Sequence, residues 1–328
     1  TNRIQTYRYG TQGTLSHLSI YSILFDRMQT IWIGTYAGGI SYYNPYGHLF
    51  DFYSPSSSLN KTLGILGPAI EHDGTLYIGA EGGGLITFDL EQQTFQQYIL
   101  PHNPGESMQS VIKTVYYDKN RILCGTSIGE IYEFNLHNHH FSLIFQNNDR
   151  NPIYHISKSI SGELIVGSTS PKEGLMFISD PPSLHVQTEF AVKGEDTFRF
   201  ASVICVCEIS NDVFLIGTKE KGLFFYDKIN HSLLSYNHTN GLTAKHISSI
   251  LKDRSGRIWI SSMDGGLSEF NITTEQFTTY NEKSGLQSNQ VCKVVEGADN
   301  SLWISTLNGI SRLDLRTRSI TNYNKESG

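Results

Sequence analysis

The stretch "ILKDRSGRIWISSMDGGLSEFN", residues 250–271, decides the fold because it recurs along the chain. An alternating apolar run ends in Asp-Arg-Ser-Gly, a second run carries Trp259, and Asp264-Gly265-Gly266 separates it from a third run. Nearly the same text occurs as "ILFDRMQTIWIGTYAGGISYYN" at residues 23–44 and as "VVEGADNSLWISTLNGISRLDL" at residues 294–315. A recurrence of this length indicates one structural unit that is repeated.

The repeat can be counted on a short apolar strand that ends in Gly or Ser before a small residue. Seven residues mark this position: Gly34, Gly79, Gly125, Gly167, Gly217, Ser261 and Ser305. Successive markers are 42 to 50 residues apart, so seven copies with a period near 44 account for almost all of the 328 residues.

Each copy divides into four short strands joined by polar turns. In the sixth copy we expect strands at His246–Lys252, Arg257–Ser261, Leu267–Asn271 and Gln276–Tyr280. Strands separated by two to five turn residues pair as antiparallel hairpins, and no segment has a sustained helical period. Four antiparallel strands repeated seven times predict an all-β fold, a seven-bladed β-propeller of four-stranded blades that spans residues 1–328 as one domain.

Aromatic and apolar residues recur at two strand positions in these copies. The second strand carries Trp32, Tyr77, Leu123, Leu215, Trp259 and Trp303, and the fourth strand carries Tyr53, Tyr98, Tyr236, Tyr280 and Tyr323. A four-stranded sheet has two faces to cover, so we expect these side chains to pack between neighbouring blades.

The two ends of the sequence offer alternative closing strands. "RIQTYRYG" near the start is similar to "SITNYNKESG" at the finish, and both have the pattern of a fourth strand. We expect Ile4–Tyr7 to join the seventh blade. We also expect this propeller to be the N-terminal one of a longer protein that contains further repeats.

The residues "DRSGRIWISSMDGGLSEFN", with "NGLTAKHISSI" before and "FTTYNEKSGL" after, resemble the two-component regulator propeller repeat. Copies one, six and seven match this pattern well, whereas copies three and four are degenerate. The resemblance implies the periplasmic sensor region of a hybrid two-component histidine kinase, of the kind that controls polysaccharide utilisation in Bacteroidetes-type bacteria by sensing glycan fragments.

The same resemblance implies the partners of the chain. They are an oligosaccharide or other small ligand, further propeller and β-sandwich domains of the same full-length protein, and a second copy in a homodimer. The formal net charge of −6 and the lack of Lys/Arg runs argue against a nucleic-acid partner. No cofactor is expected.

We expect binding residues on the loops of one rim, because loops held by a rigid scaffold carry most recognition. The turns between second and third strands contribute Tyr36, Glu81, Lys172, Glu173, Lys219, Lys221, Asp264 and Asn308. The connections between copies contribute His17, Gln109, Arg199, Lys245, His246 and Asn289. Lys172, Lys219, Lys221 and Arg199 come from adjacent copies and could form a positive arc suited to an acidic sugar.

Catalysis and metal binding have weaker support in the sequence. "DRSGRIW" is similar to the Asp-box turns of sialidase propellers, where Asp253 would cap a turn without catalysing. We could place no paired acid and base, so an enzyme of the lyase or hydrolase type is a lesser alternative. A protein-interaction scaffold is the other alternative. "HNHH" at residues 137–140 is expected to be a polar turn and not a metal site.

Overall fold

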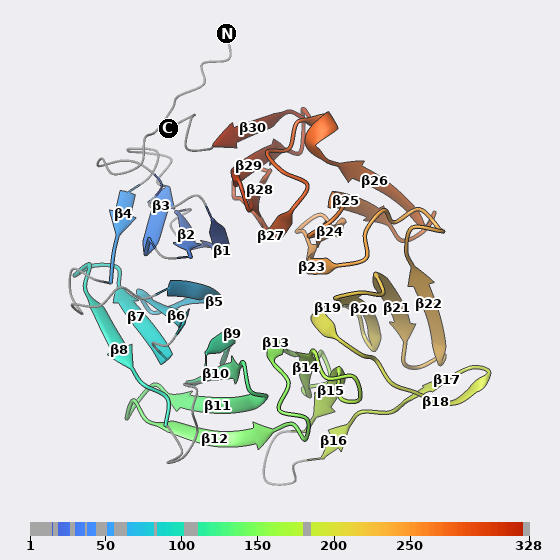
Figure 1. Cartoon of the computed structure of the whole chain (residues 1–328), viewed down its shortest axis with the longest axis horizontal. Helices are drawn as coiled ribbons and strands as arrows, with labels where there is room; N and C mark the ends of the chain where they lie inside the picture. Colours follow the sequence, from blue (N-terminus) through green and yellow to red (C-terminus); the bar gives the residue numbers. More distant parts are fainter. Residues whose placement is uncertain are drawn as a thin grey trace.

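Seven four-stranded antiparallel sheets are arranged in a ring around a central axis in the computed structural model (Figure 1). The structure describes residues 15, 19–26, 30–36, 38–43, 51–55, 64–81, 84–101, 111–179 and 185–323. Each sheet is built from one continuous segment, and its strands follow one another from the axis outward. The predicted seven-bladed β-propeller is confirmed.

The strands of equivalent position form concentric layers (Figure 1). The innermost strands are β1 (Ile20–Phe25), β5 (Gly64–His72), β9 (Ile112–Asp118), β13 (Ile153–Lys158), β19 (Val203–Ser210), β23 (Ile247–Lys252) and β27 (Val291–Glu296). The second strands are β2 (Ile31–Thr35), β6 (Thr75–Glu81), β10 (Arg121–Thr126), β14 (Leu164–Ser168), β20 (Val213–Thr218), β24 (Ile258–Ser262) and β28 (Ser301–Thr306).

Two further layers complete the blades. The third strands are β3 (Ile40–Tyr43), β7 (Gly84–Asp89), β11 (Glu130–Asn135), β15 (Leu175–Ile178), β21 (Leu223–Asp227), β25 (Gly266–Asn271) and β29 (Gly309–Asp314). The outermost strands are β4 (Asp51–Tyr53), β8 (Phe95–Tyr98), β12 (Phe141–Gln146), β16 (Val186–Gln187), β22 (Ser232–Tyr236), β26 (Gln276–Tyr280) and β30 (Ile320–Tyr323). The described part of the chain has one helical turn, η1 (Glu282–Ser284), and contains no helix long and apolar enough to cross a membrane.

The outer strand of the seventh blade differs from our expectation. β30, residues 320–323, pairs with β29 and completes that sheet, so the fourth position is filled by the C-terminal candidate and not by Ile4–Tyr7. Ile4–Tyr7 itself lies outside the described residues. The first and seventh blades meet through side chains, with Trp303 packed among Ile20, Ile23 and Ile33.

The core consists of seven clusters of buried apolar side chains in the described part of the chain, one at each junction between blades. The second-strand residues predicted to pack between blades do so: Trp32 contacts the second blade, Trp259 the seventh and Trp303 the first. The fourth-strand tyrosines join the same clusters.

The degenerate fourth blade compensates for its missing tryptophan with other aromatic residues. Ile165 stands at the tryptophan position, and β16 is only two residues long. An additional hairpin of β17 (Phe190–Val192) and β18 (Glu195–Phe198) follows it and brings Phe190 into edge-on contact with Phe177 and Phe200. The hairpin therefore supplies the bulk that this junction lacks.

The glycines that mark the repeat lie where neighbouring blades come closest. A Cβ on Gly217 would lie 2.5 Å from Cys205 Sγ in the same blade and 2.6 Å from Ile247 Cγ2 in the next. Gly79 and Gly125 meet Ile112 and Ile153 of the following blades in the same way. The repeated glycine is thus required by close approach of the next inner strand.

The aspartate of the repeat caps the turn between first and second strands. The Asp253 carboxylate, whose side chain is fully buried, accepts hydrogen bonds from Arg257 N at 2.9 Å and Trp259 Nε1 at 3.0 Å. Burial on its own would raise the pKa of Asp253, but the Trp259 and Arg257 hydrogen bonds outweigh burial and hold this pKa below its ordinary value. Asp253 therefore has the capping role expected from the sequence.

The seventh blade lacks this cap. Gly297 takes the position of the aspartate, six residues before Trp303, and the buried Trp303 Nε1 has no hydrogen-bond partner in the described part of the chain.

We expect Gly217→Ala to destabilise the propeller by about 1–3 kcal/mol, because the new methyl group overlaps Cys205 and Ile247. Denaturant unfolding measures this change. Ser261→Ala is the matched control, since residue 261 already carries a Cβ and its hydroxyl has no partner among the described residues. Equal stability of Gly217→Ala and the parent would show that the close approach is not a constraint.

We expect Trp259→Phe to cost about 1–3 kcal/mol more than Trp303→Phe in the free energy of unfolding. Both indoles are buried, but only Trp259 donates to a buried carboxylate. Equal losses in the two variants would mean that the Asp253 hydrogen bond adds nothing to stability.

Candidate functional site

A cavity of about 610 Å³ lies on the axis of the ring. Its walls contain residues from all seven inner strands, together with a few turn residues. The lining residues are Tyr21, Ala69, Ile70, Lys113, Thr114, Val115, Tyr154, His155, Ile156, Thr169, Ile204, Cys205, Val206, Lys219, His246, Ser248, Ser249, Ile250, Met263, Cys292, Lys293 and Leu307. The volume falls within the roughly 300–1,000 Å³ usual for small-molecule sites.

An irregularity in strand pairing points the side chains at this cavity. Each inner strand shifts register near its start. One residue has no partner on the second strand in six of the blades, and residues 66–68 have none in the second blade. A β-bulge of this kind directs two successive side chains to the same side. Consecutive pairs accordingly line the cavity: Lys113-Thr114, Tyr154-His155, Ile204-Cys205, Ser248-Ser249 and Cys292-Lys293.

The charged residues in the cavity wall are all basic. Lys113, Lys219 and Lys293 line it, and no Asp or Glu occurs among its described lining residues. Burial lowers the pKa of Lys293, which lies deep within the ring while part of its surface still faces the cavity. The local charge of the wall is therefore positive.

Two histidines of the wall are uncharged at neutral pH. Burial, with a smaller contribution from the Lys293 charge, lowers the pKa of His155 to about 4. Burial also lowers the pKa of His246, against the nearby Asp264 carboxylate. The His155 ring nitrogen Nε2 lies 2.8 Å from Ser157 Oγ. Neutral imidazoles can both donate and accept hydrogen bonds, which suits a ligand rich in hydroxyl groups.

Tyrosine rings form the remaining polar surface. Tyr21 and Tyr154 line the cavity, and the Tyr36 ring lies 5.5 Å from that of Tyr21 at an angle of 35°. Between 38 and 43% of each residue is exposed. Burial raises the pKa of Tyr21 and of Tyr154, so both phenols remain protonated donors at neutral pH.

Five of the predicted rim residues lie in the cavity wall or at its mouth. Lys219 and His246 line the cavity, and Tyr36 packs on Tyr21. The Glu81 charge contributes to the raised pKa of Tyr21, after the effects of burial, Cys292 and Tyr36. The Asp264 carboxylate accepts hydrogen bonds from the backbone nitrogens of Lys245 and His246, at 3.0 and 3.2 Å. It thereby holds the connection between the fifth and sixth blades in place.

Five further predicted residues do not line the cavity: Lys172, Lys221, Arg199, Asn289 and Asn308. Arg199 forms an ion pair with Glu189 beside the additional hairpin, which removes it from the expected positive arc. Asn289 Oδ1 accepts from Glu282 N at 2.9 Å and stabilises η1. His17, Gln109 and the aromatic tip at residues 46–50 lie outside the described residues.

Three residues of the cavity wall were not predicted as site residues: Lys113, Lys293 and His155. They lie on inner strands, whereas the prediction considered only loops. Alignment of the copies would have shown the signal. In six of the seven inner strands, the residues directly after the first buried position are Tyr21, Lys113, Tyr154, Ile204, Ser248 and Cys292. Such variable and partly polar residues are unusual at a position that would pack in a core.

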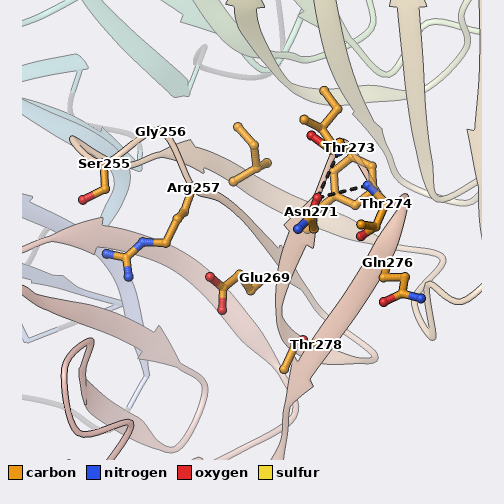
Figure 2. Close-up of a pocket in the computed structure, with 12 residues that line it drawn as sticks. Ser255, Gly256, Arg257, Glu269, Asn271, Thr273, Thr274, Gln276 and Thr278 are labelled. Atoms are coloured by element: carbon orange, nitrogen blue, oxygen red, sulfur yellow. Dashed lines mark hydrogen bonds between the residues drawn. The ribbon is translucent and has the colours of Figure 1, made fainter.

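A second hollow lies on the side of the sixth blade and is lined by Arg257, Glu269, Thr278 and their neighbours (Figure 2). A hollow in the second blade has Thr75, Thr87 and Gln96 at the corresponding positions. The two have volumes of about 450 and 170 Å³. Because the same groove recurs at equivalent positions of the repeat, we attribute it to blade geometry and not to a dedicated site.

We expect the free energy of unfolding to fall as the pH is lowered from 6.5 to 4, because protonation of His155 would place a charge in a buried position. The folded chain keeps His155 neutral down to about pH 4, whereas the unfolded chain takes up a proton near 6.5, so the unfolded state binds more protons in this window. His155→Gln should reduce the stability lost over this pH range by about 1–3 kcal/mol. Denaturant unfolding at several pH values measures this change. An unchanged slope would contradict the buried, uncharged state.

Comparisons with solved structures support the fold. A chain of PorZ, a bacterial surface component of the type-IX secretion system of Porphyromonas gingivalis, matches with a TM-score of 0.72 at 12% identity, over 97% of this chain and 48% of that chain. The computationally designed Ika8 protein matches with a TM-score of 0.62 at 14% identity, over 94% and 88% of the two chains. At these identities the likeness concerns the fold alone.

Two structures of the extracellular domain of BT4673 from B. thetaiotaomicron, one of them named as a hybrid two component system, share 16% identity with this chain. Their TM-scores are 0.48 and 0.46, and the matches cover 94 and 92% of this chain but 55 and 47% of theirs. The chain thus spans about half the length of these proteins. No curated protein shows significant sequence similarity to it. Residues 14–37 and 241–264, in the first and sixth copies, match the two component regulator propeller family.

Proposed function

We propose that this chain is the ligand-sensing propeller of an extracytoplasmic two-component sensor and that it responds to a glycan fragment. The axial cavity carries this proposal, because a ligand in it would touch residues from all seven blades. The family match of two copies supports the regulatory role. A periplasmic location, and a kinase elsewhere in the same protein, are parts of the proposal that follow from the resemblance.

The wall of the cavity has the chemistry that a saccharide needs. Tyr21, Tyr36 and Tyr154 provide partly exposed aromatic faces for sugar rings. His155 and His246 add neutral donors and acceptors for hydroxyl groups, and the Ser248 hydroxyl, which donates to Val291 O, adds an acceptor. The rigid surrounding sheets hold these groups in place before binding, which reduces the entropy that is lost when a complex forms.

Signalling would follow from unequal affinity for two arrangements of the ring or of its neighbours. A ligand shifts such an equilibrium only by the difference between its binding free energies for the two states. Because the cavity wall contains a piece of every blade, a small change in blade spacing changes several ligand contacts at once. This geometry gives the ligand the required preference for one arrangement.

Isothermal titration of the propeller against a panel of di- to tetrasaccharides tests the proposal. We expect one or more members to bind, and Tyr21→Ala to weaken that binding at least about tenfold by removing an aromatic contact. Leu143→Ala, on the exposed outer strand β12, is the matched control and should bind as the parent does. Absence of heat with every saccharide, together with capture of a protein partner, would favour the scaffold alternative, and release of shortened products would favour a lyase or hydrolase.

A further inference from the structure

The lysines of the axial cavity come from alternate blades. Lys113 lies on β9 of the third blade, Lys219 follows β20 of the fifth, and Lys293 lies on β27 of the seventh. Cations placed at three separate positions around a ring surround whatever occupies its axis. We infer that this cavity binds an anionic group, and that the ligand of the propeller is an acidic saccharide whose carboxylate or sulfate lies among these lysines.

Lys293 lines the cavity together with His155 of the fourth blade and Cys205 of the fifth. No Asp or Glu occurs among the described lining residues of the cavity. An anion on the axis would therefore meet Lys293 directly, without an intervening carboxylate from the protein.

Several partly buried cations of this chain have counter-charges. Lys158, Lys228 and Arg257 form ion pairs with Asp118, Glu163 and Asp253. Within the described residues no ion pair involves Lys113, Lys219 or Lys293. Like charges around one cavity repel one another, and burial lowers the pKa of Lys293. A bound anion offsets both effects, since it supplies charge-assisted hydrogen bonds.

The rest of the wall fits a sugar better than a bare inorganic ion. The cavity holds far more than one phosphate or sulfate, and tyrosine rings stand beside the lysines. Its neutral hydroxyl and imidazole groups match ring hydroxyls, whereas an inorganic ion would leave most of them without partners. The inference therefore rests on the proposed function, which is saccharide binding, and names the chemical class of the saccharide.

The test compares matched ligands and matched variants by isothermal titration. Acidic probes are digalacturonic acid and a sulfated chondroitin disaccharide, and the neutral counterparts are the dimethyl ester of digalacturonic acid and the unsulfated, esterified chondroitin disaccharide. We expect at least one acidic probe to bind about tenfold or more tightly than its neutral counterpart. Its affinity should fall as the salt concentration rises from roughly 50 to 500 mM, because salt screens exposed charges.

The variants Lys293→Met and Lys113→Met should each lower the affinity for that acidic probe about 10- to 100-fold. Methionine keeps much of the bulk of lysine, so thermal unfolding can confirm that the variants remain folded. Lys172→Met and Lys221→Met remove lysines that do not line the cavity and should bind as the parent does.

The outcomes separate this inference from the proposed function. Equal affinity for acidic and neutral counterparts, or acidic binding that survives both cavity substitutions, overturns the anionic site while saccharide binding stands. No binding of any probe, with none in the wider saccharide panel, overturns both. A charge-selective affinity that is lost only in the two cavity variants establishes the site.

Discussion

The close approach between the second strand of one blade and the inner strand of the next is the constraint on which the rest of the ring depends. Gly79, Gly125 and Gly217 leave no room for a side chain because an isoleucine of the following blade occupies that space. These contacts bring inner strands together around the axis, and the apolar clusters farther out fill the widening gaps between blades. The inner strands thus come close enough to line one cavity.

The bulges of the inner strands connect this packing to recognition. The side chains of a regular strand point alternately to its two faces, so only every second side chain would face the axis. The register shifts let adjacent residues such as His155 and Tyr154 both face the cavity, while Ile153 still packs on Gly125 of the preceding blade. One local irregularity thus allows a six-residue strand to serve both the blade junction and the cavity wall.

Sequence reasoning succeeded where the repeat itself carried the information. Trp32, Trp259 and Trp303 pack between blades, and Asp253 caps its turn, as their recurrence predicted. It was less successful where copies diverge. The additional hairpin after β16 has no counterpart in other copies, and the residue pattern does not reveal that its Phe190 packs on Phe177 and Phe200.

The candidate site shows the same division. The expected rim was defined by loop position, and that criterion found Lys219 and His246 but also residues such as Arg199, whose side chain has a local partner. Lys113 and Lys293 lie in strands, and which way they point depends on a bulge that the residue pattern does not reveal without aligning the copies. Their grouping around the axis is a property of the closed ring and not of any single repeat.

The construction of each blade from one continuous segment has a mechanical consequence. In the part of the chain that the structure describes, no strand of the first blade is shared with the seventh, so their junction is joined by packed side chains such as Trp303 against Ile20 and Ile33. A force that separates these two blades would act on side-chain packing, since no strand pairing among the described residues crosses their junction.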